Sequence, residues 1–134
     1  MELAENNPLD TGIIARLVTN REDLQLMFPN ASWPFDHRQW GELIDRSKGN
    51  ISFIVREGDQ QIGHAALFNR GVPDTYTLGL LFIVPELRSQ GFGRRMIGEV
   101  EKYAVQRLGV KRLFLRVRDF NLPALNCYLK CGYQ

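Results

Sequence analysis

Hydrophobic and polar positions along this chain follow two periods, and together they predict a mixture of strands and helices. Residues 51–68 contain two β-rich runs around a Glu-Gly-Asp turn, which predicts a hairpin. Residues 75–84 are nearly all apolar or β-prone, as in a central strand covered on both faces. Gly79 inside this run indicates a bulge or a close backbone approach, and Pro85 ends the strand.

Helical spacing is clearest between Phe92 and Leu108, where apolar side chains recur every four residues. This spacing predicts a helix over 92–108, with Gly109 as its C-terminal cap. Asn20 and Asp36 are predicted N-caps of two earlier helices. The three other predicted helices cover residues 20–28, 37–47 and 121–132.

The remaining segments complete the predicted order β-α-α-β-β-β-α-β-α. A short apolar run predicts a first strand at 12–18, and residues 1–10 read as a loose tail. Residues 111–117 alternate and predict a last strand. Because a helix connects 75–84 to 111–117, these two strands are expected to be parallel neighbours. The fold class predicted is therefore α/β with a mixed sheet.

Composition narrows the class of protein. The chain has 134 residues, which suits one domain, and its net charge of +2 is too small to argue for nucleic acid or a membrane surface. No apolar run is long enough for a membrane span, and the acidic N-terminus differs from a secretory signal. Cys127 and Cys131 lack metal-ligand spacing with His37 and His64, so we expect no metal and a reducing, cytoplasmic setting.

A glycine-rich turn joins the strand at 75–84 to the helix at 92–108, and three arginines, Arg88, Arg94 and Arg95, crowd it. Positive charge opposes the dipole at the start of a helix, so the turn is predicted to bind an anion such as phosphate. Neither a P-loop nor a complete dinucleotide fingerprint is present, because Met96 stands where the third glycine would be. A tight connector with exposed arginines is the alternative.

Two motifs together suggest a family. The turn reads R-x-x-G-x-G over 88–93, and residues 121–133 read NLPALNCYLKCGY. This pair resembles the acyl-CoA motif and the N-x-x-A-x-x-x-Y-x-x-x-G-[FY] segment of the GCN5-related N-acetyltransferase (GNAT) superfamily. The resemblance is strong over 51–134 and rests on element order over 12–50. It implies a single GNAT-like domain over 1–134.

The resemblance also implies roles for particular residues. Tyr128 would point its hydroxyl at the thioester sulfur and protonate the leaving thiolate, as a catalytic acid. The side chain of Asn121 would touch the arm of acetyl-CoA near its pyrophosphate or pantetheine. The other cofactor-binding positions are the strand backbone for pantetheine and the turn for pyrophosphate, namely Leu81, Phe82, Ile83, Arg88, Ser89, Gln90, Gly91, Phe92, Gly93 and Arg94.

The activity implied is acetyl transfer from acetyl-CoA to a primary amine by direct attack in a ternary complex. Arg116 stands where a branch that acts on ribosomal-protein N-termini carries a catalytic glutamate. This difference favours a small-molecule amine over a protein terminus as acceptor. The general base stays open among Asp74, Tyr76, His64, His37 and a water chain to a backbone carbonyl. His64 shares an apolar strand face, so we expect it to be partly buried and hydrogen-bonded rather than a base.

Three alternatives remain open at this point. Phe28, Trp33 and Phe35 either line an acceptor pocket or cap the core around a turn. Family members usually continue with two more strands after the Gly-Tyr pair, which this sequence lacks, so the 111–117 edge is expected to be covered by a second chain, as in a homodimer, or by a longer protein. A non-catalytic acyl-CoA-binding or sensing module, or a phosphate-binding domain unrelated to CoA, would explain the same turn.

Overall fold

The computed structural model describes residues 1–115 of the chain. Its centre is a five-stranded mixed sheet whose spatial order follows the chain. Neighbouring strands are antiparallel except for the last pair, β4 and β5, which is parallel as predicted. The strands are β1 (Glu2–Glu5), β2 (Ile51–Glu57), β3 (Gln60–Asn69), β4 (Thr75–Ile83) and β5 (Arg112–Leu115).

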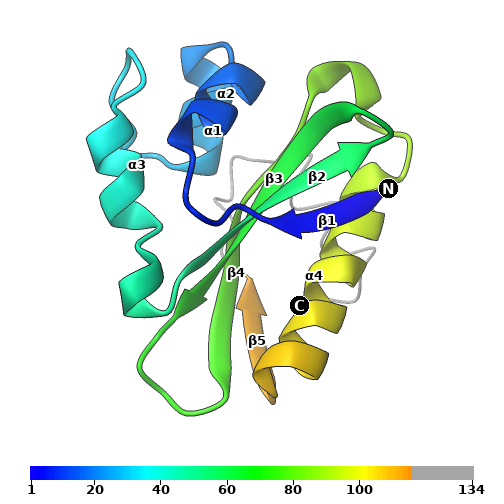
Figure 1. Ribbon diagram of the computed structural model, residues 1–134. Coiled ribbons are helices and arrows are strands. Elements are labelled where there is room, and N and C mark those ends of the chain that lie inside the picture. Colours follow the sequence, from blue (N-terminus) through cyan, green and yellow to red (C-terminus); the bar gives the residue numbers. More distant parts are fainter. Residues whose placement is uncertain (116–134) are drawn as a thin grey trace.

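Helices cover both sides of this sheet: α1, α2 and α3 lie on one side and α4 on the other (Figure 1). They are α1 (Thr11–Leu17), α2 (Arg21–Met27), α3 (His37–Leu43) and α4 (Phe92–Leu108), with short 3₁₀ turns at Arg46–Lys48 and Pro85–Leu87. β2 and β4 are buried at nearly every position, as expected for strands covered on both faces. The predicted α/β fold class is confirmed.

Several predicted elements are confirmed together with the residues that begin or end them. α4 covers 92–108 as predicted, and Gly109 follows it in the left-handed conformation at φ 64°. Asn20 caps α2 by accepting a hydrogen bond from the Asp23 amide, and Asp36 caps α3 in the same way. α3 is shorter than its prediction because it ends at Leu43, and a 3₁₀ turn follows.

Two predictions for the N-terminal region are wrong. Residues 12–18 are not a strand, because α1 covers most of them and the Asp10 side chain caps it by accepting from the Gly12 amide at 2.9 Å. Residues 1–10 are not a loose tail, since Glu2–Glu5 pairs antiparallel with β2. The chain therefore begins with an edge strand whose partner is distant in sequence, since Leu3 lies opposite Val55.

Candidate active site

β4 contains a bulge next to the predicted position Gly79. Its register with β3 slips between the pairs His64–Phe82 and Ala66–Gly79, so β4 has one residue more than β3 in this interval. Leu80 is in the left-handed region at φ 52°, which is unusual for a residue other than glycine. The predicted bulge is confirmed, and the strained residue is Leu80 rather than Gly79.

Beyond the bulge, β4 presents backbone groups at the edge that faces β5. The amide of Val84 donates to the carbonyl of Ile62 at 2.8 Å, so Val84 faces β3. Backbone groups alternate in direction along an extended strand, which directs those of Ile83 and Leu81 to the opposite edge. β5 pairs in parallel with β4 over Thr75–Leu78, before the bulge. The geometry suits an extended ligand that pairs with β4 like an additional strand.

Arg88 folds back onto this strand instead of pointing into the turn. Its Nε donates to the carbonyl of Ile83 at 2.9 Å, and its guanidinium carbon lies 5.2 Å from the centre of the Phe82 ring. Its Nη2 also lies 3.5 Å from the Asp23 carboxylate on α2. The arginine therefore ties α2 to the end of β4, and it occupies one of the carbonyls predicted to bind pantetheine.

The turn itself offers a run of free backbone donors. Within the described part of the chain, the amides of Ser89 through Arg94 have no acceptor, whereas the Arg95 amide donates to the carbonyl of Gly91 at 3.1 Å. Gly91 is the N-cap at φ 87°, and an added Cβ there would meet nothing within 4 Å. A row of exposed, unpaired amides at a helix start is what binding of a phosphate requires.

The charge around these amides is positive. The first turn of α4 contains no acidic residue, although carboxylates are favoured at that position. Arg94 and Arg95 are exposed, and the guanidinium carbon of Arg95 lies 5.4 Å from the centre of the Phe92 ring. The start of the helix therefore carries positive charge that nothing in its own first turn neutralises.

A pocket of about 170 Å³ lies between the end of α2, α3 and the bulge in β4. Leu80 and Gly79 form its floor on the sheet, and Phe28 forms part of its wall. Its remaining lining residues are Leu26, Met27, Pro29, Asn30, Leu43, Phe68 and Arg70. The lining is mostly apolar, and Arg70 is its one charged residue among those described.

The three aromatic residues of the loop divide between lining the pocket and capping the core, and a role in binding the acceptor stays a prediction. Phe28 lines the pocket and also meets Trp40 edge-on, with ring centres 5.5 Å apart. Phe35 stacks on Trp40 at 5.4 Å and does not line the pocket, so it caps the core. Trp33 also lies outside the pocket lining and is 43% exposed.

His64 is hydrogen-bonded through both ring nitrogens, as predicted, and it is fully rather than partly buried. Its Nδ1 lies 2.9 Å from the carbonyl of Leu80, and its Nε2 lies 2.7 Å from the hydroxyl of Ser52. Asn6 donates to the same hydroxyl at 3.3 Å. Burial lowers the pKa of His64 to about 4, so it is neutral at neutral pH and is no general base for an ammonium substrate.

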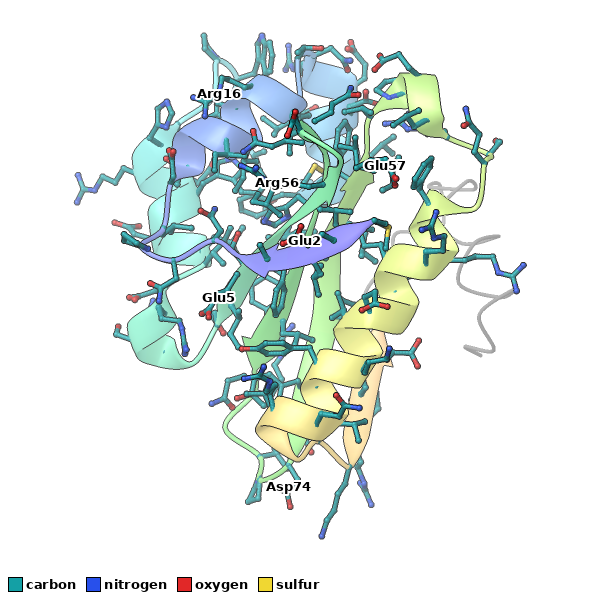
Figure 2. The ribbon with its side chains drawn as sticks, turned by 45° about the vertical axis from the view of Figure 1, so that its right-hand side comes forward. Glu2, Glu5, Arg16, Arg56, Glu57 and Asp74 are labelled. Carbon is teal, nitrogen blue, oxygen red and sulfur yellow. The ribbon has the colours of Figure 1, made fainter. Side chains whose placement is uncertain are left out.

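The other candidate bases lie away from the turn or have another partner. Asp74 and Tyr76 are at the start of β4, and Figure 2 shows Asp74 at the end of the molecule where α4 finishes, opposite the glycine turn. Both residues therefore lie at the opposite end of β4 from the bulge, and their candidacy as bases stays a prediction. His37 is exposed and pairs through Nδ1 with the Thr11 hydroxyl at 2.8 Å.

Sequence reasoning missed the partners of His64. Ser52 and Asn6 come from β2 and from the segment after β1, which meet only in the folded chain. One sign was available, since Ser52 is a lone polar residue within the apolar run ISFIV and is 4% exposed. Asn121, Tyr128 and Arg116 lie outside the described residues, and their proposed roles stay predictions.

Residues 1–115 contain neither a candidate metal centre nor a candidate membrane-spanning helix. There, no group of three or more His, Cys, Asp or Glu side chains is placed to hold a metal ion. No helix in the same range combines the length and the apolar character needed to cross a membrane.

Comparison with known proteins completes the description. The acetyltransferase (GNAT) family matches residues 17–133. The uncharacterised N-acetyltransferase YhfO of Bacillus subtilis is 30% identical over 89 residues, which are 63% of this chain and 59% of the relative. An uncharacterised Mycobacterium leprae protein is 25% identical over 134 residues, which are 98% of this chain and 36% of the relative. This chain therefore spans about a third of the Mycobacterium leprae relative and somewhat over half of YhfO.

A solved structure has the same fold. Spermidine N-acetyltransferase from Vibrio cholerae, determined in complex with CoA and spermine, superimposes with a TM-score of 0.77 at 20% identity. The match covers 98% of this chain and 79% of that one.

Proposed function

Because the chain belongs to the acetyltransferase (GNAT) family, we propose that it transfers an acetyl group from acetyl-CoA to a primary amine. The observation that supports this most directly is the run of unpaired amides from Ser89 to Arg94 at the start of α4. These donors suit the pyrophosphate of acetyl-CoA, and Arg94 adds positive charge beside them.

In this proposal the edge of β4 aligns the reactive end of the substrate. The pantetheine arm pairs with the backbone of Leu81 beyond the bulge, since the Ile83 carbonyl already accepts from Arg88. A backbone N–H near Ile83 stabilises negative charge on the thioester oxygen. Tyr128 donates a proton to the departing thiolate. The amine attacks the thioester directly, and no covalent enzyme intermediate is required.

The acceptor is proposed to enter the pocket beside the bulge. A polyamine carries several positive charges, and its recognition calls for several carboxylates near the pocket. No acidic side chain is among the described lining residues of the pocket, which are mostly apolar. We therefore propose a small-molecule acceptor with one amine on an apolar body, in contrast to the spermine bound by the Vibrio cholerae neighbour.

A direct test measures thiol release from acetyl-CoA with a panel of amines. The panel pairs an arylalkyl or alkyl monoamine with spermidine and with a peptide that has a free N-terminus. We expect the highest kcat/KM for an apolar monoamine. Faster turnover of spermidine than of every monoamine would contradict the acceptor assignment, while leaving the acetyl transfer itself supported.

A non-catalytic acyl-CoA-binding module is the second candidate. It is favoured by one observation: within residues 1–115, the candidate base beside the bulge is His64, and both of its ring nitrogens are already hydrogen-bonded. Calorimetry separates the two functions. Tight CoA binding without turnover of any amine would support the binding module, and absence of CoA binding would remove both.

A further inference from the structure

The bulge in β4 contains a backbone carbonyl, that of Leu80, which is hydrogen-bonded to the buried side chain of His64. Leu80 has φ 52°, a left-handed conformation that is strained in residues with a Cβ. Such a residue persists only where its surroundings fix it. Its carbonyl lies 2.9 Å from Nδ1 of His64, on the neighbouring strand β3.

The direction of each hydrogen bond around His64 can be assigned by starting from the Leu80 carbonyl, which only accepts. The Leu80 carbonyl can only accept, so Nδ1 of His64 carries the proton. Nε2 then accepts from the Ser52 hydroxyl, and that hydroxyl accepts from the amide of Asn6. The oxygen of the Asn6 side chain in turn accepts from the backbone N–H of Asp10. His64 is held in one tautomer by a chain of donors that begins at the N-cap of α1.

The bulge shapes both the pocket proposed for the acceptor and the strand edge proposed for pantetheine. Leu80 and Gly79 line the pocket, and the extra residue sets which backbone groups of Leu81 and Ile83 face the β5 edge. A displacement of about 1 Å between reacting groups is enough to slow a reaction about 100-fold.

We propose that His64 is a positioning residue for acetyl transfer: by donating to the Leu80 carbonyl it holds the bulge of β4 in the shape that aligns thioester and amine. This inference rests on the proposed function. His64 acts only on the geometry of the strand, because its ring exchanges no proton with the substrate.

Two substitutions test separately the hydrogen bonds that the His64 ring makes to Leu80 and to Ser52. In His64→Asn the side-chain amide is as many bonds from Cα as Nδ1, so it can still donate to Leu80. In His64→Gln the amide reaches as far as Nε2, so it retains the Ser52 side and loses the bond to Leu80. We expect His64→Gln to lower kcat by about 10- to 100-fold. We expect His64→Asn to keep kcat within about threefold, because the bond to Leu80 is retained.

The dissociation constant of 3′-phospho-ADP, which carries the pyrophosphate of CoA without its pantetheine arm, serves as the internal control, because this fragment would contact the turn at 89–94 and not the strand beside the bulge. We expect it to stay within about twofold in either variant. Equal losses of kcat in the two variants, or losses that follow only the folded fraction, would overturn the positioning role.

Hydrogen exchange keeps the inference testable even if the proposed function fails. Should the wild-type protein turn over no amine, amide exchange at Leu80, Leu81 and Phe82 still reports the shape of the bulge. We expect faster exchange in His64→Gln than in His64→Asn. The same exchange in both variants would show that His64 does not hold the bulge.

Discussion

A single buried histidine couples the stability of this protein to pH. Water is excluded from His64, and no charged group is hydrogen-bonded to its ring. The neutral ring satisfies one donor and one acceptor in the folded chain, whereas the protonated ring would present a second donor to Ser52. Folding therefore selects the neutral form, which is why the folded-state pKa falls to about 4.

The sign of the resulting pH dependence follows from linkage. The unfolded pKa of histidine is about 6.5, so between that value and about 4 the unfolded chain holds a proton that the folded chain lacks. The contribution to the free energy of unfolding is complete above about pH 6.5 and is lost as the pH falls toward 4. We expect His64 to account for a loss of roughly 2–3 kcal/mol between about pH 7.5 and about pH 4.5.

Urea unfolding of wild type and of His64→Asn at both pH values checks this expectation. Asparagine does not titrate, so the difference between the two proteins isolates the histidine from the carboxylates. We expect the wild-type advantage to shrink on acidification. Parallel pH curves for the two proteins would show that the buried ring does not control acid stability.

At the scale of elements, helix α4 offers a matched pair of glycines for testing the turn. Gly91 lies at its start at φ 87°, and Gly98 lies on its exposed face with nothing within 4 Å of an added Cβ. Gly91→Val strains the backbone and moves the neighbouring amides, so we expect the Kd for CoA to rise by more than about tenfold. Gly98→Ala replaces a poor helix former, and we expect it to add about 0.5–1 kcal/mol of stability.

Calorimetric titration with CoA distinguishes the two variants, since only Gly91→Val is expected to change the affinity. Unaltered CoA binding in Gly91→Val would argue that the turn is only a connector with exposed arginines.

The close packing of β3 against β4 makes a second prediction for the sheet. A Cβ on Gly63 would lie 2.6 Å from the carbonyl oxygen of Phe82 and 2.9 Å from Cδ1 of Ile83. The carbonyl belongs to the backbone, so the strands must separate, and we expect Gly63→Ala to cost about 1–3 kcal/mol. Gly41→Ala in α3 is the control, because nothing lies within 4 Å there. Denaturant midpoints of the two variants should move in opposite directions, and a neutral Gly63→Ala would show that β3 can yield.

Local sequence patterns were sufficient to predict the elements whose own residues determine their structure. The four-residue spacing and the closing glycine predicted α4, and turn chemistry predicted the β2–β3 hairpin. At 12–18 two adjacent isoleucines favoured a strand, but Ile14 and Leu17 form one buried helical face behind the Asp10 cap. That cap was the sign in the sequence that pointed to a helix.

Features of the whole molecule depend on distant contacts and were not predictable in the same way. β1 has no strong strand pattern of its own, and it forms because β2 offers an edge to pair with. The orientation of Arg88 likewise depends on Asp23 from α2, a helix more than 60 residues earlier. The family motif predicts the turn, whereas tertiary contacts decide which of its side chains remain available to a ligand.

At the scale of the whole molecule, CoA binding and catalysis are expected to depend on separate parts of the chain. Ligand at about 100 times its Kd stabilises a folded protein by about 2.7 kcal/mol, so CoA should raise the Tm by several degrees. Tyr128→Phe removes only the proposed acid, and we expect it to keep this rise while turnover falls about 100-fold. Gly91→Val should lose the rise and the turnover together.

Thermal unfolding with and without CoA, run beside the thiol-release assay on the same samples, measures both properties. Turnover that persists in Tyr128→Phe would remove the acid role, because a phenyl ring donates no proton to the thiolate. If CoA no longer raises the Tm of Tyr128→Phe, then Tyr128 is among the groups that bind CoA. Binding by the glycine turn and catalysis by the C-terminal motif would then not be separate functions.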